Sequence, residues 1–299
     1  MSSSALIINA PAKINLYLGV YPERDARGYH RVDSLMAAVD LSDTVTVELA
    51  ETLEVVTVPA ADCPMEKNTA YRAALAMAER YAREANVRIT VEKRIPLCAG
   101  LGGPSTDAAA VIVALAELWR IDRSDPALDD IARTIGADVP FFLHASPSFY
   151  EGGGDVFVEE FAPLAHTPVV LIKPRDARVS TVEAYRAFDA APPAAAPGEP
   201  ICEALRQGDA SRVLSLIHNN LGIISAQMEP RIAEVLAWMR EQEGVVASDV
   251  CGSGACSFAV CESTEAAERI AWEARTRGEW WVCETSIIGS TCTILCVAN

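Results

Sequence analysis

The chain has 299 residues, with 25 Lys and Arg against 41 Asp and Glu, for a formal net charge of −16. Hydrophobic residues make up 51% and charged residues 22%, which excludes a disordered chain. The length predicts two lobes. Because the basic residues are few and scattered, nucleic acid is not expected as the main partner, whereas backbone amides could still bind a small anion.

Cysteine usage and the first segment bear on location. The nine cysteines include no CxxC pair and no Cys/His cluster at zinc spacing. Residues 1–20 lack the basic start and long apolar core of a secretory signal, and no long uncharged apolar stretch predicts a membrane span. We therefore expect a cytoplasmic protein with reduced, mostly buried thiols.

The first third of the chain alternates strand and helix patterns. Short apolar or alternating runs predict strands at Ala5–Ile8, Lys13–Val20, Asp43–Ala50 and Val87–Lys93, with a polar loop at Pro22–His30. Asn68–Ala85 has alanine and methionine along one face and predicts a helix that Asn68 or Thr69 caps.

A glycine-rich segment, Pro96–Asp107, separates the last of these strands from an apolar run that ends at Trp119. The run is apolar nearly all round, so it predicts a helix buried in the core. A further helix is expected over Leu128–Ile135, ending at Gly136.

The second half of the chain is predicted to be rich in helix. Proline and alanine gather at Ala190–Pro200, which indicates a solvated linker. The predicted elements beyond it are helices at Pro200–His218, Glu229–Glu243 and Thr264–Thr276, a Gly-Ser-Gly turn at 252–254, and strands at Cys256–Glu262 and Thr291–Val297.

The Gly100–Thr106 segment is the strongest local signal for a ligand. Glycines let the backbone approach a phosphate closely, and a helix N-terminus attracts anions. The pattern is neither a Walker loop nor a dinucleotide fingerprint. A plain strand-to-helix turn with Ser105 or Thr106 as a cap explains the same residues.

Several other polar residues could have either a role in a ligand site or a purely structural role. Lys13 in an apolar strand faces either a site or the solvent edge, and Asn15 shares its face. Asp138 between apolar residues is either a helix cap or a base for a hydroxyl. Tyr29 and His30 could bind a nucleobase by stacking and hydrogen bonding, although this pair of residues alone is a weak signal for such a site. The turn at 252–254 is either a tight turn or a close approach to a ligand.

Five motifs in a fixed order resemble the GHMP small-molecule kinases, over about residues 10–262. These motifs are Pro11–Leu16, Gly28–His30, Pro96–Ala110, Gly136–Phe142 and Gly252–Cys256. The resemblance implies a two-lobed α+β fold. Residues 1–160 would form an N-terminal lobe similar to domain 2 of ribosomal protein S5, and residues 161–299 a ferredoxin-like α+β lobe.

The resemblance also implies the roles of individual residues. Lys13 and Asp138 would be the catalytic pair, with Asp138 orienting or deprotonating the attacking hydroxyl and Lys13 stabilising the transferred phosphoryl group. The residues assigned to the acceptor are Asn15, Tyr29, His30, Tyr185, Gly252, Ser253 and Gly254. The residues assigned to ATP are Asn68, Pro96, Gly100, Leu101, Gly102, Gly103, Pro104, Ser105 and Thr106.

The implied reaction uses ATP, with Mg²⁺ bridging its phosphates. The implied acceptor is a cytidyl diphosphate methylerythritol of the non-mevalonate isoprenoid route, phosphorylated on its 2-hydroxyl. Nucleic acid and membrane are not expected as partners, and a monomer and a homodimer both remain open.

The chain departs from the family pattern at two places that matter here. Pro104 replaces a glycine and removes one amide donor from the predicted phosphate loop, and Arg27 stands where aspartate usually precedes Gly-Tyr-His. Two alternatives therefore stay open: a kinase of the same family that uses another alcohol, such as mevalonate or homoserine, and a degenerate nucleotide-binding paralogue. A purely structural protein would leave the ordered motifs unexplained.

Overall fold

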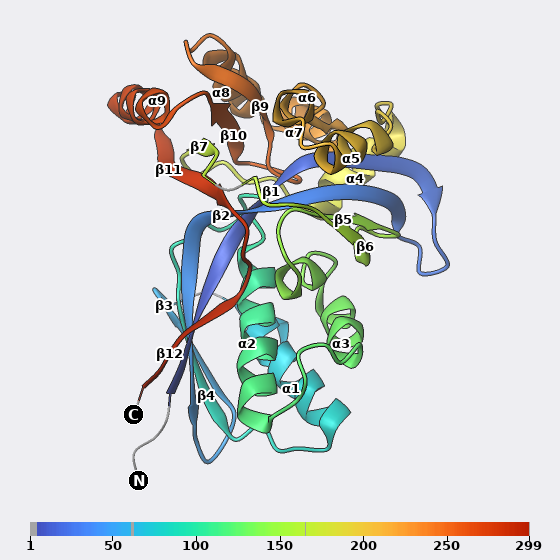
Figure 1. The fold of residues 1–299 in the computed structure, drawn as a ribbon, viewed down its shortest axis with the longest axis vertical. Helices are drawn as coiled ribbons and strands as arrows, with labels where there is room; N and C mark the ends of the chain where they lie inside the picture. Colours follow the sequence, from blue (N-terminus) through green and yellow to red (C-terminus); the bar gives the residue numbers. More distant parts are fainter. Residues whose placement is uncertain (1–4, 61–62, 165, 299) are drawn as a thin grey trace.

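Two long antiparallel strands form the spine of the molecule. In the computed structural model, which describes residues 5–60, 63–164 and 166–298, β1 spans Ala5–Arg24 and β2 spans His30–Leu49. Both extend between the lower left and the upper right of Figure 1, in opposite directions, and so pass through both lobes. The N-terminal segment for which no secretory signal is expected includes residues 1–4, which lie outside the described part.

The remaining strands extend this spine into one 12-stranded sheet. They are β3 (Glu54–Val58), β4 (Val87–Glu92), β5 (Ser148–Glu151), β6 (Val156–Glu160), β7 (Pro168–Pro174), β8 (His218–Asn219), β9 (Val245–Val250), β10 (Ser257–Cys261), β11 (Trp280–Ile288) and β12 (Thr293–Ala298). The main path runs β12-β1-β2-β11-β7-β10-β9, with β3 and β4 continuing from β2 in the first lobe.

Three helices cover one face of the sheet in the first lobe: α1 (Thr69–Tyr81), α2 (Gly103–Trp119) and α3 (Ala127–Ile135) (Figure 1). Helix α2 is buried on nearly every side and lies in a core with α1, β2 and β4. This confirms the prediction that the apolar run after the glycine-rich segment is a core helix.

The second lobe lies at the other end of the spine. Its helices are α4 (Thr181–Ala190), α5 (Glu199–Arg206), α6 (Ala210–Ser215), α7 (Asn220–Met228), α8 (Pro230–Arg240) and α9 (Thr264–Thr276). Helices α8 and α9 pack against β7, β9, β10 and β11 in a second apolar core. Two short 3-10 turns, Met65–Lys67 and Pro140–Leu143, complete the described elements.

The predicted strand boundaries need correction. Ala5–Ile8 and Lys13–Val20 belong to the single strand β1, because the chain passes Pro11 with only a shift in register. Asp43–Ala50 is the end of a longer strand, and the predicted loop Pro22–His30 shortens to the five residues between β1 and β2. The first half of β2 escaped prediction because it is buried on both faces and does not alternate.

One predicted helix in the second half is wrong. Pro200–His218 divides into α5 and α6 because the chain turns at Gly208, where φ is +69°. Helix α7, which follows, was not predicted, nor were α4, β3, β5, β6, β7, β9 and β11. The linker at Ala190–Pro200 is confirmed for the stretch between α4 and α5, which is mostly exposed.

The architecture is mixed α and β, as expected from the sequence. The last strand, β12, returns to the first lobe and pairs with the start of β1 (Figure 1). The predicted division into an N-terminal lobe of residues 1–160 and a C-terminal lobe of residues 161–299 therefore stays a prediction. Eight free cysteines are described, five of them buried, as expected. None of the described helices is long and apolar enough to cross a membrane.

Candidate active site

A cavity of about 960 Å³ lies where the two lobes meet. Segments far apart in the sequence line it: the middle of β1, the β1–β2 hairpin, the glycine-rich loop before α2, the Asp138 segment, α4, and the 252–254 turn. The predicted site residues that line it are Lys13, Asn15, Tyr29, His30, Pro96, Gly100, Leu101, Gly102, Gly103, Pro104, Ser105, Asp138, Tyr185, Gly252, Ser253 and Gly254.

Lys13 and Asp138 face each other in this cavity. Lys13 is only 3% exposed, and its Nζ lies 3.3 Å from Asp138 Oδ2. It also donates a 2.9 Å hydrogen bond to Asn15 Oδ1, while Asn15 Nδ2 donates to Ser34 Oγ at 3.0 Å. The structure thus excludes a solvent-edge position for Lys13 and fixes its ammonium group beside a carboxylate that is partly exposed to the cavity.

Two glycines make room for the Lys13 side chain. Gly102 and Gly252 both have positive φ, +74° and +53°. A Cβ at residue 102 would lie 3.0 Å from Lys13 Cγ, and one at residue 252 would lie 3.3 Å from Lys13 Nζ. Because both loops approach the lysine this closely, they must turn without side chains there.

The glycine-rich loop leads into the N-terminus of α2. Gly102 is the residue before the helix, and no side chain caps it. In the first turn of α2, Pro104 has no N–H and the Ser105 amide already donates to the Gly102 carbonyl oxygen at 3.0 Å. The Gly103 amide and the helix dipole are therefore what this helix end offers to a negative charge at the cavity. This geometry favours anion binding over a turn capped by Ser105 or Thr106.

The same loop is bonded to the 252–254 turn of the other lobe. The amides of Ala255 and Cys256 donate to the carbonyl oxygens of Cys98 and Ala99, at 3.1 and 3.2 Å. A Cβ at Gly100 would collide with the carbonyl group of Cys251. The two loops therefore form one continuous wall of the cavity.

Pro104 occupies the first turn of α2, where its missing N–H leaves no helical bond unmade. Its carbonyl oxygen accepts a 2.5 Å hydrogen bond from Thr69 Oγ1 at the start of α1. The substitution is thus compatible with the helix and costs the cavity one backbone donor.

Two residues assigned to ATP do not line the cavity. Thr106 is fully buried, and its hydroxyl lies 3.5 Å from Cys292 Sγ in the core. The Asn68 side chain accepts a hydrogen bond from the Ala70 amide and caps α1. The Thr106 side chain points into the core and the Asn68 side chain caps α1, so the assignment of these two residues to ATP stays a prediction.

The predicted acceptor side is lined by aromatic rings. His30 is buried and stacks on Tyr185, with ring centroids 5.4 Å apart. Burial, reinforced by the charge of Asp138, raises the pKa of Tyr185 to about 12, so its phenol stays neutral. Tyr29 is 62% exposed and stands at the rim. Tyr185 thus contacts His30 directly.

Asp189 and Asn219 were missed by the sequence analysis. Asp189 Oδ1 lies 3.0 Å from His30 Nε2 on the cavity wall. It follows Tyr185 by four residues on α4, a spacing that becomes a signal only once that helix is known. Asn219 donates hydrogen bonds to the carbonyl oxygens of Val250 and Gly252, which supports the 252–254 turn. It precedes a helix that was itself unpredicted.

A buried ionic cluster lies beneath the start of α2. Lys93 Nζ contacts Asp43 Oδ2 at 2.5 Å and Asp107 Oδ2 at 2.6 Å. Burial raises the pKa of Asp107 to about 7, with Lys93 opposing the shift and Asp43 adding to it. The cluster links β2, the end of β4 and α2, and so holds the helix that carries the glycine-rich loop.

No group of three or more His, Cys, Asp or Glu side chains suited to a metal occurs within residues 5–60, 63–164 and 166–298. The oxygen donors that do line the cavity near the start of α2 are few, and they include Ser105 and Asp138. Such a set suits an ion held largely by a ligand's own phosphates.

Two family models match the chain. Residues 68–146 match the GHMP kinases N terminal domain, and residues 201–279 match the GHMP kinases C terminal domain. A 4-diphosphocytidyl-2-C-methyl-D-erythritol kinase of Desulfitobacterium hafniense (strain Y51) is 36% identical over 280 residues, 91% of this chain and 93% of the relative. The Wolbachia pipientis wMel protein of the same name is 32% identical over 292 residues, 94% of this chain and 98% of the relative.

Solved structures share the fold. The crystal structure of a 4-(cytidine 5'-diphospho)-2C-methyl-D-erythritol kinase superposes with a TM-score of 0.76 at 36% sequence identity. The superposition covers 95% of this chain and 100% of the other. Homoserine kinase from Cytophaga hutchinsonii ATCC 33406 gives the same TM-score, 0.76, at 19% identity, covering 97% of each chain. At that identity the second likeness concerns the fold alone.

Proposed function

The chain belongs to the GHMP kinase family of ATP-dependent small-molecule kinases, and from this premise we propose that it phosphorylates 4-diphosphocytidyl-2-C-methyl-D-erythritol on the 2-hydroxyl. One observation carries the proposal. A single cavity contains the glycine-rich loop, the Lys13–Asp138 pair and the cluster of Tyr29, His30 and Tyr185. A kinase for a nucleotide-bearing alcohol needs all three.

The proposed chemistry rests on Lys13 and Asp138. Asp138 is the only carboxylate of the described residues in contact with Lys13, and it would accept or orient the proton of the attacking hydroxyl. Lys13 would stabilise the negative charge on the phosphoryl group during its transfer. Asn15, which is itself bonded to Ser34, holds the ammonium group in place, which suits a reaction driven by positioning and electrostatics.

The phosphate side is proposed to be the loop from Gly100 to Ser105. Its glycines expose backbone amides, and the α2 N-terminus adds a favourable dipole. Mg²⁺ belongs to the same proposal, with Ser105 and Asp138 as oxygen donors beside the nucleotide phosphates. Such an ion would neutralise negative charge on the phosphates.

The acceptor side is proposed to bind cytosine between the exposed ring of Tyr29 and the His30–Tyr185 stack. Arg186, on the same wall, makes no ion pair within the described chain, in contrast to Lys13 and Arg24. Its free guanidinium suits the diphosphate of the acceptor. A small acceptor such as homoserine or mevalonate has no use for these features.

The two alternatives receive less support. Another alcohol as acceptor leaves the aromatic cluster and Asp189 without a role. A degenerate paralogue would not need Lys13 buried next to Asp138, because burying a lysine is costly without a function or a partner. Pro104, which favoured that alternative, fits the first turn of α2 without loss of helical bonds.

A coupled ADP-release assay with ATP and Mg²⁺ tests the proposal. The four conditions are the cytidyl acceptor, mevalonate, homoserine and no acceptor. Turnover with the cytidyl acceptor alone is the expected result. Turnover with another alcohol would overturn the choice of acceptor, and ATP binding without turnover of any acceptor would point to the degenerate paralogue.

The setting of the reaction is also proposed. We infer a cytoplasmic enzyme because eight described cysteines are free thiols, two of them exposed, which a reducing compartment preserves. Its partner would be the small-molecule acceptor, with no nucleic acid. Gel filtration with light scattering distinguishes a monomer from a homodimer.

A further inference from the structure

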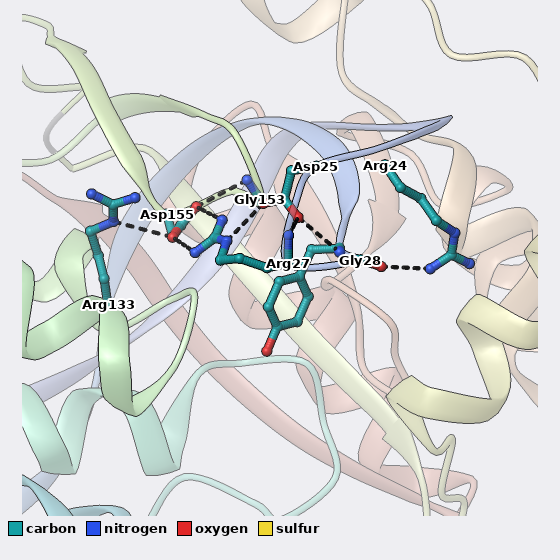
Figure 2. Close-up of polar contacts among 8 residues, drawn as sticks. Arg24, Asp25, Arg27, Gly28, Arg133, Gly153 and Asp155 are labelled. Carbon is teal, nitrogen blue, oxygen red and sulfur yellow. Dashed lines mark hydrogen bonds and ion pairs between the residues drawn. The ribbon is translucent and has the colours of Figure 1, made fainter.

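The β1–β2 hairpin is tied to the rest of the first lobe through Asp155. Arg27 makes two hydrogen bonds to this carboxylate, Nη1 to Oδ2 at 2.7 Å and Nη2 to Oδ1 at 3.1 Å. The Asp155 side chain is only 2% exposed. It also accepts from the Gly153 amide at 2.9 Å and from Arg133 Nε at 3.2 Å, as Figure 2 shows.

Within the hairpin, Arg27 and Asp25 shape the turn that presents Tyr29. Asp25 accepts from the Arg27 side chain and from the Tyr29 amide, at 2.7 and 3.0 Å. Gly28 turns with φ at +83°, and its carbonyl oxygen accepts from Arg24 at 2.7 Å (Figure 2). The Arg27 guanidinium lies 5.1 Å from the centre of the Tyr29 ring and so covers one of its faces.

These contacts have a chemical consequence for the rim of the cavity. A mobile, exposed tyrosine loses side-chain and loop freedom when a base stacks on it, which weakens binding. Here the backbone of Tyr29 is fixed by Asp25, and its ring lies against a guanidinium that a buried carboxylate holds. Tyr29 lines the cavity and is 62% exposed, so one face of its ring is held against Arg27 while the side chain stays open to a ligand at the rim.

We propose that Arg27 is a positioning residue for the acceptor: its bidentate pair with Asp155 preorganises Tyr29 as the stacking surface for the cytosine ring. The inference rests on the proposed function, because it takes the base of the acceptor as the ligand. Arg133, in the last turn of α3, shares the same carboxylate, so Asp155 also connects the hairpin to the helix that leads to Asp138.

The test compares Arg27→Ala with Arg31→Ala. Arg31 belongs to the same hairpin, but its partner, Asp33, is on its own strand, so this control removes the same charge without cutting the tether to Asp155. For Arg27→Ala we expect the acceptor KM to rise about tenfold, with kcat and the KM for ATP within about twofold of the parent. Arg31→Ala should leave all three constants within about twofold of the parent.

Two further variants separate positioning from a general loss of structure. Arg27→Lys keeps the charge but cannot form the bidentate pair, so its acceptor KM should lie between those of the parent and Arg27→Ala. Asp155→Ala removes the Arg27 pair together with the contacts to Gly153 and Arg133. The double variant of Arg27→Ala with Asp155→Ala should therefore bind the acceptor no worse than Asp155→Ala alone, because the pair is already lost in that single variant. The proposal is overturned if Arg27→Ala leaves the acceptor KM unchanged. It is also overturned if this variant lowers kcat and raises the KM values for the acceptor and for ATP by similar factors.

Hydrogen exchange measured by mass spectrometry on the ligand-free protein tests the Arg27–Asp155 tether separately from the proposed kinase function. Amides of residues 25–30 should exchange about tenfold faster in Arg27→Ala than in Arg31→Ala. If the parent fails to turn over the cytidyl acceptor, the proposed function fails while this comparison still reports on the tether. If exchange is unchanged while the parent is active, the tether is the part that is wrong.

Discussion

Asp138 combines partial exposure with a fixed partner. Its side chain is 37% exposed, so a substrate hydroxyl can reach it, while Lys13 holds one of its oxygens. Asp138→Asn keeps the shape and removes the proton acceptor. We expect kcat to fall about 10²–10³-fold in the coupled ADP-release assay, with the circular dichroism spectrum unchanged.

Asp129→Asn is the matched control for that experiment. Asp129 has similar exposure, 38%, and also contacts one basic side chain, His144, but it lies outside the cavity. Its substitution should leave kcat within about twofold of the parent. Equal activity of Asp138→Asn and the parent would remove Asp138 from the proposed chemistry.

Substitution of Tyr29 should weaken acceptor binding while leaving the stability of the fold almost unchanged. Because its ring is mostly exposed, Tyr29→Ala should change the free energy of unfolding by less than about 0.5 kcal/mol. Stacking of a base on an aromatic ring contributes about 1–3 kcal/mol, so the acceptor KM should rise about tenfold while the KM for ATP stays constant. Tyr29→Phe keeps the ring and should retain the parent KM.

The sequence could identify most residues of the site because they belong to ordered motifs with distinctive chemistry. It could not show which way a side chain points. Thr106 lies within the glycine-rich motif yet faces Cys292 in the core, and Asp189 reaches the cavity from a helix whose pattern was too short to recognise. Side-chain direction depends on packing between distant segments, which one sequence does not reveal.

At the scale of elements, the position of α2 depends on the Lys93 cluster. Lys93→Met leaves the carboxylates of Asp43 and Asp107 buried without their cation, which should cost about 3–5 kcal/mol of unfolding free energy near pH 8. The pKa of Asp107 is raised in the folded chain, so protonation relieves the cost, and stability falls as pH rises from about 4 to above 7.

Urea unfolding of the parent and Lys93→Met at pH 5 and pH 8 checks this prediction. The gap between the two proteins should be larger at pH 8, because loss of the lysine raises the pKa of Asp107 further. Lys67→Met is the control, since that lysine is exposed and makes no ion pair in the described chain. An equal gap at both pH values would mean that the carboxylates do not titrate with folding.

Elements with a clear period or cap were predictable. Thr264–Thr276 has its expected bounds, with the side chain of Ser263 as the cap, and α3 ends at Gly136 as its sequence suggests. Strands that are buried on both faces, such as β7 and the first half of β2, show no alternation. Helix α7 begins at an Asn219 cap, directly after the end of the predicted helix Pro200–His218, and no element was predicted there.

At the scale of the whole molecule, β1 and β2 make the lobes interdependent. Each strand has 20 residues and takes part in both lobes, and β12 returns from the second lobe to pair with β1. We expect one cooperative unfolding transition in urea, with the same midpoint by far-ultraviolet circular dichroism and by tryptophan fluorescence. Four of the five tryptophans follow residue 230. Separate midpoints would instead support two independent domains divided near residue 160.

The close contact between the 98–102 and 251–256 segments restricts how this enzyme can be recombined with its relatives. The carbonyl group of Cys251 occupies the space that a side chain at residue 100 would need, and the two segments share backbone hydrogen bonds. A chimera with a single crossover anywhere from 103 to 250 takes the two segments from different parents. Libraries of hybrids should therefore yield active members mainly when both segments come from one parent, which makes them a linked pair for directed evolution although about 150 residues of chain separate them.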